Sequence, residues 1–139
     1  MRASRGFTLM EIMIALGILG ILAGVAVPQY IRTVERGYWR SAQDILRTIY
    51  TGEQVYYTVN QKYTATPGTL GEWRSKLYMD NPNTGGTATA VSYTIAAGGA
   101  GPGATFTATA KRLGGTTSSG KTITLTQNGE PFGGSWTMP

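Results

Sequence analysis

The first 30 residues hold the longest apolar stretch of the chain. No charged residue occurs from Ile12 to Val27, and Glu11 is the only charge from Phe7 to Val27. The 16 uncharged residues are fewer than the roughly 20 that cross a bilayer as a helix, whereas the 21 residues that begin at Phe7 reach this length. A membrane-spanning helix is therefore predicted only if it includes a carboxylate. Such a group costs on the order of 2 to 3 kcal/mol at the bilayer centre and less near a helix end.

The pattern then changes to one apolar residue every three or four positions, which is typical of a helix with a single apolar face. The recurring positions are Ile31, Val34, Tyr38, Ala42, Ile45, Ile49, Gly52, Tyr56 and Val59. Together the two patterns predict one helix from Phe7 to about Asn60, roughly 80 Å long at 1.5 Å per residue. Its second half should pack against a folded head.

Residues 63–90 are predicted to be mostly loop, interrupted by a short helix at Thr69–Met79. Three runs of alternating apolar and Thr or Ser residues follow, at Val91–Ala97, Ala104–Ala110 and Lys121–Gln127. This alternation predicts antiparallel strands with one face in water. Asn128-Gly129 is a hairpin signal that leads to Pro131–Trp136 as an edge strand. The predicted class is α+β: a long N-terminal helix whose second half packs on a three- or four-stranded antiparallel sheet.

Composition argues against enzymatic activity. The chain has no cysteine and no histidine, so it lacks disulfides, thiolates, imidazole bases and the commonest zinc ligands. We therefore expect no catalytic residues, no metal site and no cofactor. The net charge is +5, and it becomes +3 if the first six residues are removed. This excess is too small to indicate nucleic-acid binding by itself.

Basic residues nevertheless follow one another along the second half of the predicted helix. They are Arg32, Arg36, Arg40 and Arg47, interleaved with Glu35 and Asp44. They could contact lipid headgroups, acidic groups of a neighbour or DNA, but a solvated helix face with local ion pairs is favoured. A DNA-uptake protein would also use Lys111, Arg112 and Lys121 against phosphate. Nucleic acid is thus a partner that the sequence allows without indicating it.

Three interpretations of the N-terminal segment compete. A conventional signal peptide would use Arg2 and Arg5 as its basic region and Gly24–Ala26 as its cleavage site, and the chain would then be a secreted binding module. A plain anchor would keep the segment, with Thr8 and Glu11 forming a capping box that closes the first helical turn.

The third interpretation depends on the string Arg5-Gly6-Phe7-Thr8-Leu9-Met10-Glu11 followed by Pro28. This string resembles the prepilin leader of type IV pilins and type II secretion pseudopilins. The resemblance implies cleavage after Gly6 and N-methylation of Phe7, with the apolar segment retained. The chain would then divide into a leader (1–6), a transmembrane and assembly segment (7–30) and a globular head (31–139).

Cleavage would create an ammonium group at Phe7, which is charged at neutral pH. A buried ammonium and a buried carboxylate cost much less as a pair than singly, and Phe7 and Glu11 are four residues apart on one helix. The pair could therefore close within one subunit. The resemblance instead implies that Glu11 reaches Phe7 of a neighbouring subunit, beside the capping residue Thr8.

Small residues and a proline interrupt the apolar segment. Gly17, Gly20 and Gly24 thin one side of the helix, and Gly20–Gly24 is a GxxxG step that allows close helix approach. Pro28 should kink or loosen the helix. In relatives the region corresponding to Gly20–Pro28 can unwind in the filament, and the resemblance implies the same here.

The resemblance implies a structural subunit of a type IV pilus-like filament. The implied partners are copies of the chain and other pilins, a prepilin peptidase, an inner-membrane platform protein and an assembly ATPase. The precursor would lie in the inner membrane and the product in an extracellular filament or a periplasmic pseudopilus. A type II secretion pseudopilin is the alternative. After residue 80 Glu130 is the only acid, so few ligands exist for the calcium loop of major pseudopilins, which favours a pilus subunit.

Overall fold

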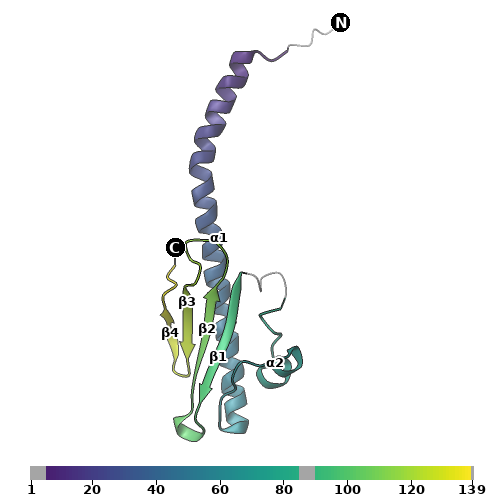
Figure 1. The fold of residues 1–139 in the computed structure, drawn as a ribbon, viewed down its shortest axis with the longest axis vertical. Helices are drawn as coiled ribbons and strands as arrows, with labels where there is room; N and C mark the ends of the chain where they lie inside the picture. Colours follow the sequence, from purple (N-terminus) through teal and green to yellow (C-terminus); the bar gives the residue numbers. More distant parts are fainter. Residues whose placement is uncertain (1–5, 85–89, 139) are drawn as a thin grey trace. The chain divides into compact units, whose positions relative to one another are not determined.

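The computed structural model describes residues 6–84 and 90–138. The long helix α1 (Leu9–Asn60) is followed by a short helix α2 (Leu70–Leu77), a single 3-10 turn at Gly101–Gly103 and four strands (Figure 1). The strands are β1 (Val91–Gly98), β2 (Thr105–Arg112), β3 (Thr122–Thr126) and β4 (Gly129–Gly134). The predicted α+β class is confirmed. The chain divides into two compact units, and the boundary between them lies within α1, between Glu35 and Arg36.

The four strands form one antiparallel sheet in the order β1-β2-β3-β4. Every second residue of β1, β2 and β3 is buried, as the alternating sequence pattern predicts. These inward side chains pack on the part of α1 that follows Arg36, which the sheet crosses in Figure 1. The most buried core side chains are Leu46, Ile49, Trp73, Leu77, Phe106, Ile123 and Leu125.

The outer edge of β1 is closed by polar side chains from the preceding loop. The Asn83 side-chain amide accepts from the Tyr93 N–H at 2.7 Å and donates to the Tyr93 carbonyl at 2.8 Å. The Thr66 hydroxyl accepts from the Ile95 N–H at 2.6 Å, and the Thr66 N–H donates to the Ile95 carbonyl at 3.1 Å. These bonds occupy backbone groups that would otherwise offer a pairing edge to another chain.

Several details differ from the sequence predictions. Ile31 and Val59, at the two ends of the predicted apolar stripe, are 52% and 77% exposed. The buried line of α1 instead includes Leu46 and Glu53. The edge strand begins at Gly129, two residues before the predicted start, because it pairs with β3 directly after the turn. Residues 85–89 of the predicted loop lie outside the described part of the chain.

Candidate functional site

The candidate site is the predicted assembly segment, residues 7–30, which begins with a partial cap. The Thr8 hydroxyl accepts a hydrogen bond from the Glu11 N–H at 3.2 Å, and the Thr8 carbonyl accepts from the Ile12 N–H at 3.3 Å. A threonine in this position satisfies one of the free N–H groups at a helix start. The structure thus supplies one of the two bonds of a capping box, with Glu11 in the first turn.

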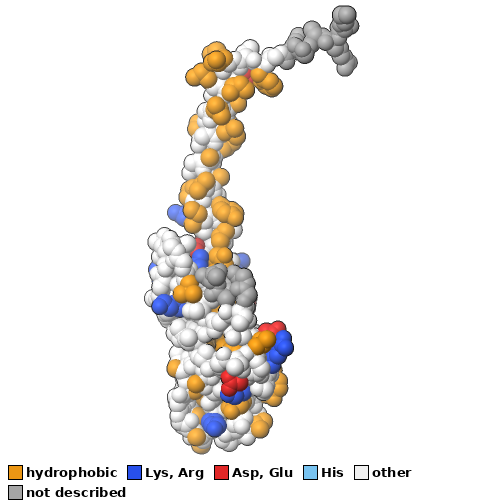
Figure 2. Space-filling model, turned by 45° about the vertical axis from the view of Figure 1, so that its right-hand side comes forward, with side chains coloured by type: hydrophobic (Ala, Val, Ile, Leu, Met, Phe, Trp, Pro, Cys, Tyr) orange, Lys and Arg blue, Asp and Glu red, His pale blue; other side chains and the backbone are white. Residues whose placement is uncertain are grey.

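The assembly segment is apolar on all sides. Its large hydrophobic side chains are between 46% and 79% exposed, and Figure 2 shows them around the N-terminal part of α1. Beyond Arg36 the surface shown in Figure 2 is mostly polar, with scattered hydrophobic side chains. By length and composition α1 can cross a membrane, and the mean hydropathy of its most apolar window is 2.3. Exposure on this scale requires lipid or other helices as surroundings.

The glycines of the assembly segment are not required by packing against any other described residue. A Cβ atom added at Gly17, Gly20 or Gly24 would meet no atom within 4 Å. Gly52, in the same helix, is different, because a Cβ there would lie 2.5 Å from the Leu77 carbonyl oxygen. Packing of α2 therefore explains Gly52, whereas no contact within the described residues explains the other three.

Among the described residues, none forms an ion pair with Glu11. Its side chain is exposed. Phe7, still joined to Gly6, precedes the first residue of the helix and is 78% exposed. Pro28 lies inside α1, and the helix continues through it to Asn60. The assembly roles of Gly6, Phe7, Thr8 and Glu11 stay predictions, as do the packing roles of Gly20, Gly24 and Pro28.

Two arginines of the head are engaged in internal contacts. The Arg112 guanidinium donates to the carbonyls of Ala90 and Leu113 and lies 4.3 Å from the centre of the Tyr38 ring. Arg112 is buried, so it cannot serve as the phosphate contact that a DNA-binding protein would need. Arg47 forms ion pairs with Asp44 at 3.0 Å and with Glu130 at 2.8 Å, which fits the expected solvated face with local support. The sequence did not indicate the structural role of Arg112.

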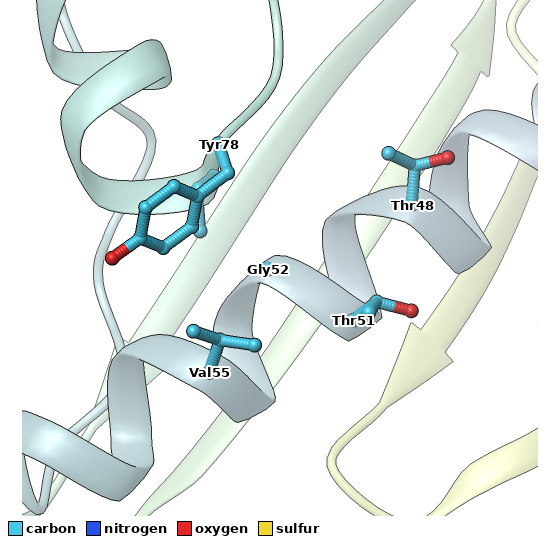
Figure 3. Close-up of a pocket in the computed structure, with 6 residues that line it drawn as sticks. Thr48, Thr51, Gly52, Val55 and Tyr78 are labelled. Atoms are coloured by element: carbon cyan, nitrogen blue, oxygen red, sulfur yellow. The ribbon is translucent and has the colours of Figure 1, made fainter.

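A groove of about 330 Å³ runs where the end of α2 meets α1. Figure 3 shows the Tyr78 ring directed toward the turns of α1 that carry Gly52 and Val55, with Thr48 and Thr51 further along the helix. Its lining has no charged residue, so the groove offers contact surface and no acid or base near neutral pH. A glycine in the middle of a predicted helix is the one feature of the sequence that signals this close approach.

Glu53 is a buried acidic residue that the sequence patterns did not indicate as a candidate. Its side chain is fully buried, and its Oε2 atom accepts from the Thr64 N–H at 2.9 Å. Its Oε1 atom has no hydrogen-bond partner within the described residues. Burial raises the pKa of Glu53 to about 7, against the opposite effect of the Thr64 hydrogen bond. The sequence does contain a signal for this burial, because Glu53 lies at helical spacing from the apolar positions Ile49 and Tyr56.

Comparison with known proteins identifies the N-terminal segment. Residues 1–27 match the family model described as the prokaryotic N-terminal methylation motif. The chain is 34% identical over 68 residues to the type IV major pilin protein PilA of Myxococcus xanthus (strain DK1622), covering 49% of this chain and 31% of that protein. It is 34% identical over 70 residues to the type II secretion system core protein G of Dickeya chrysanthemi, covering 50% and 46%. A fimbrial protein of Pseudomonas aeruginosa is 60% identical over 30 residues, covering 22% and 20%.

The N-terminal segment carries the N-terminal methylation motif and is similar to the corresponding segments of type IV pilins and of a type II secretion protein. The matches span less than half the length of each relative, and no solved structure matches the chain. The motif match includes Gly6, Phe7, Thr8 and Glu11 and extends to Val27. The similarity to a pilus protein and to a secretion protein does not separate the two branches of the family.

Proposed function

We propose that this pilin-family chain is a structural subunit of a type IV pilus-like filament, polymerised through its assembly segment. The observation that carries the proposal is the combination of an all-round apolar helix with three glycines that no internal contact requires. A helix that only crossed a bilayer would need the apolar side chains but not the glycines.

The glycines argue for a close neighbour. Each glycine in a helix interior costs up to about 1 kcal/mol relative to alanine. Gly17, Gly20 and Gly24 lie on one side of α1, and their surroundings within the chain are open. Small residues in this spacing let two helices approach closely in an apolar medium. A neighbouring subunit's helix is the partner that gives these three positions a role.

Glu11 argues for a partner with a positive charge. Removal of residues 1–6 by a prepilin peptidase would free an amine at Phe7, which N-methylation leaves charged. This amine lies next to the first turn of the helix, so it can reach a carboxylate at the same depth on an adjacent subunit. We propose that this pair sets the axial position of each subunit. The Thr8 cap is local and would form with or without the pair.

The proposal assigns residues 1–6 to the leader, 7–30 to the membrane and assembly segment, and 31–139 to the head. The precursor would be a single-pass protein of the inner membrane, and the mature subunit would join copies of itself and other pilins. A platform protein and an assembly ATPase would supply the movement out of the membrane. The product would be an extracellular filament.

Intact mass and N-terminal sequencing of the exported protein test the processing step. A mature chain that begins at a methylated Phe7 supports the proposal. A chain that begins at Val27 contradicts it and identifies a conventional signal peptide. Electron microscopy of sheared surface material then shows whether the mature chain builds a filament.

Two substitutions at Glu11 separate the charge from the cap. Glu11→Gln removes the charge and leaves the N–H that bonds Thr8, and we expect both this variant and Glu11→Ala to abolish filament assembly. Thr8→Val removes the cap and keeps the charge, and we expect assembly to persist. Normal filaments from the Glu11→Gln variant would show that the charge pair is not needed.

A pseudopilin of a type II secretion system is the second candidate, supported by the similarity to core protein G. Deletion of the gene distinguishes the two. Loss of surface filaments with normal release of secreted enzymes supports a pilus subunit, and the opposite pattern supports a pseudopilin. DNA uptake is not favoured, because Arg112 is buried in internal contacts.

A further inference from the structure

The loop that follows α1 contains a short segment that is bonded to a buried carboxyl. We call residues 63–66 of this loop the strap. The Thr64 N–H donates to the Oε2 atom of Glu53 at 2.9 Å, and the Glu53 side chain is fully buried. Ala65 and Thr66, the next two residues, are exposed. The buried carboxyl is therefore bonded to the backbone of a segment that itself lies at the surface of the head.

Contacts at both ends hold the strap on the head. At one end the Tyr63 ring packs against the Phe106 ring, with 4.7 Å between their centres. At the other end the Thr66 hydroxyl accepts from the Ile95 N–H at 2.6 Å, and the Thr66 N–H donates to the Ile95 carbonyl at 3.1 Å. The bond to the carboxyl lies between these two ends. The strap thus joins the buried carboxyl to the outer edge of β1.

No positive charge compensates the ionised form of Glu53 within the described residues. Among them Glu53 forms no ion pair, and its Oε1 atom has no hydrogen-bond partner. Arg112, on the buried side of the sheet, lies against Tyr38, and Lys76 of α2 pairs with Glu72 at 2.9 Å. The other titratable groups around the strap are phenols, which are uncharged at neutral pH: Tyr50, Tyr57, Tyr63 and, in β1, Tyr93.

We propose that the strap is a proton-controlled closure: it stays on the head while Glu53 is neutral and opens when Glu53 ionises, which uncovers the edge of β1 at Ile95. A buried carboxylate without a cation and with one unsatisfied oxygen is strongly disfavoured. Opening the strap admits water to the carboxylate and breaks few contacts, because α1 and the sheet keep their packing. An uncovered strand edge can then pair with a strand of another chain. This device does not depend on the proposed filament role.

The direction of the pH effect follows from the burial of the carboxyl. Burial raises the pKa of Glu53 to about 7, and the Thr64 hydrogen bond acts in the opposite direction. When the strap is open, the carboxyl meets water and returns toward the ordinary glutamate value. The closed strap therefore holds the proton more tightly, and closure is most complete below that ordinary value. Opening increases as the pH rises toward about 7 and then levels off.

Hydrogen exchange of backbone amides, measured by NMR on the full chain in detergent micelles, tests this closure. The N–H groups of Thr64, Thr66 and Ile95 are all hydrogen-bonded when the strap is closed, so their exchange reports its opening. Glu53→Gln keeps an oxygen for the Thr64 N–H and cannot ionise. Intrinsic exchange also varies with pH, but this variation cancels when the same amide is compared in the two chains. We expect the ratio of the unmodified rate to the variant rate to rise about five- to tenfold per pH unit between pH 5 and 7 and to level off above.

A second measurement shows whether the opening is local. Ala108 lies in β2, which pairs with a strand on each side, so its amide exchanges only when the sheet opens. Urea favours an opening in proportion to the surface that the opening exposes. The amides of Thr64, Thr66 and Ile95 should exchange faster than that of Ala108 and depend less on urea. If their urea dependence equals that of Ala108, the strap opens only with the whole head and the proposal is wrong.

Two further variants serve as controls. Thr66→Val removes the hydroxyl that accepts from Ile95 and keeps the β-branched shape, so Ile95 should exchange faster at every pH while the pH dependence at Thr64 persists. Glu130→Gln neutralises an exposed carboxylate of the head and should leave the exchange profiles unchanged. A rate ratio that stays constant from pH 5 to 8, or an effect of Glu130→Gln equal to that of Glu53→Gln, would also overturn the proposal.

Discussion

At the scale of single residues, burial of Glu53 makes the stability of the head depend on pH. A carboxylate buried with one unpaired oxygen is disfavoured in its charged form, and burial raises its pKa to about 7. The folded head therefore binds a proton at Glu53 more tightly than the unfolded chain does. Stability from this group is complete below the ordinary glutamate pKa and is lost as the pH rises through about 7.

Glu53→Gln is expected to stabilise the head at pH 8 and to have little effect at pH 4. The amide keeps an oxygen for the Thr64 N–H and removes the cost of a buried charge. The rise of the Glu53 pKa from the ordinary glutamate value to about 7 corresponds to about 3 kcal/mol of stability lost above pH 7. Urea unfolding between pH 4 and 8 measures the difference between variant and unmodified chain. A difference that does not vary with pH would contradict the prediction.

Glu72 provides the matched control, because its contribution to the stability of the head depends on pH in the opposite direction. Its pKa is lowered by the ion pair with Lys76 and by the N–H groups of Gly68 and Thr69 at the start of α2. Its stabilising effect is present above the ordinary glutamate pKa and is lost as the pH falls through the lowered value. Glu72→Gln should therefore destabilise the head at pH 7 and converge with the unmodified chain in acid, the reverse of Glu53→Gln.

At the scale of elements, close contact between α1 and α2 depends on Gly52. The Leu77 carbonyl lies where a Cβ of residue 52 would stand, and backbone on both sides limits relaxation. The capping box of Thr69 and Glu72 fixes the start of α2, and Tyr78 ends it in the left-handed conformation with φ of 56°. The short helix is thus held at both ends, and the lack of a side chain at Gly52 allows it to lie close to α1.

Gly52→Ala should destabilise the head by about 1 to 3 kcal/mol, the usual cost of overpacking a core. Gly37→Ala is the control in the same helix, because a Cβ at Gly37 meets nothing within 4 Å. It should stabilise the chain by about 0.4 to 1 kcal/mol through the unfolded state. Thermal unfolding of the two variants should therefore shift in opposite directions, and equal shifts would exclude the packing explanation.

Much of this fold could be predicted from the sequence, because period and composition determine it locally. The apolar stretch and the stripe after it predicted one helix from Phe7 to about Asn60, and α1 runs from Leu9 to Asn60. The alternation of threonines with apolar residues predicted the sheet. Gly52 and Glu53 were not predicted in their roles, because both depend on contacts with segments distant in sequence. The partner of Glu11 is not determined by sequence or by one chain, since the proposed partner belongs to another subunit.

At the scale of the whole molecule, the chain combines a head that has its own hydrophobic core with an assembly segment whose large apolar side chains are exposed. Within its described residues the head buries its core, closes the edge of β1 and holds Arg47 and Arg112 in polar contacts. The assembly segment leaves its apolar side chains exposed and its glycines uncovered. Substitutions in this segment should therefore affect assembly without affecting the stability of the head.

Gly20→Leu with Gly24→Leu tests this separation. A Cβ atom at either position meets no other described residue within 4 Å, so urea unfolding of the head in detergent should be unchanged. Between subunits they prevent the close approach of two helices, at an overpacking cost of about 1 to 3 kcal/mol, or roughly tenfold or more in association. Ala15→Leu with Ala26→Leu also introduces two leucines, on the opposite side of α1, and should impair filament yield less. Equal filament yields from both variants in sheared preparations would show that the glycine side of the helix is not a contact.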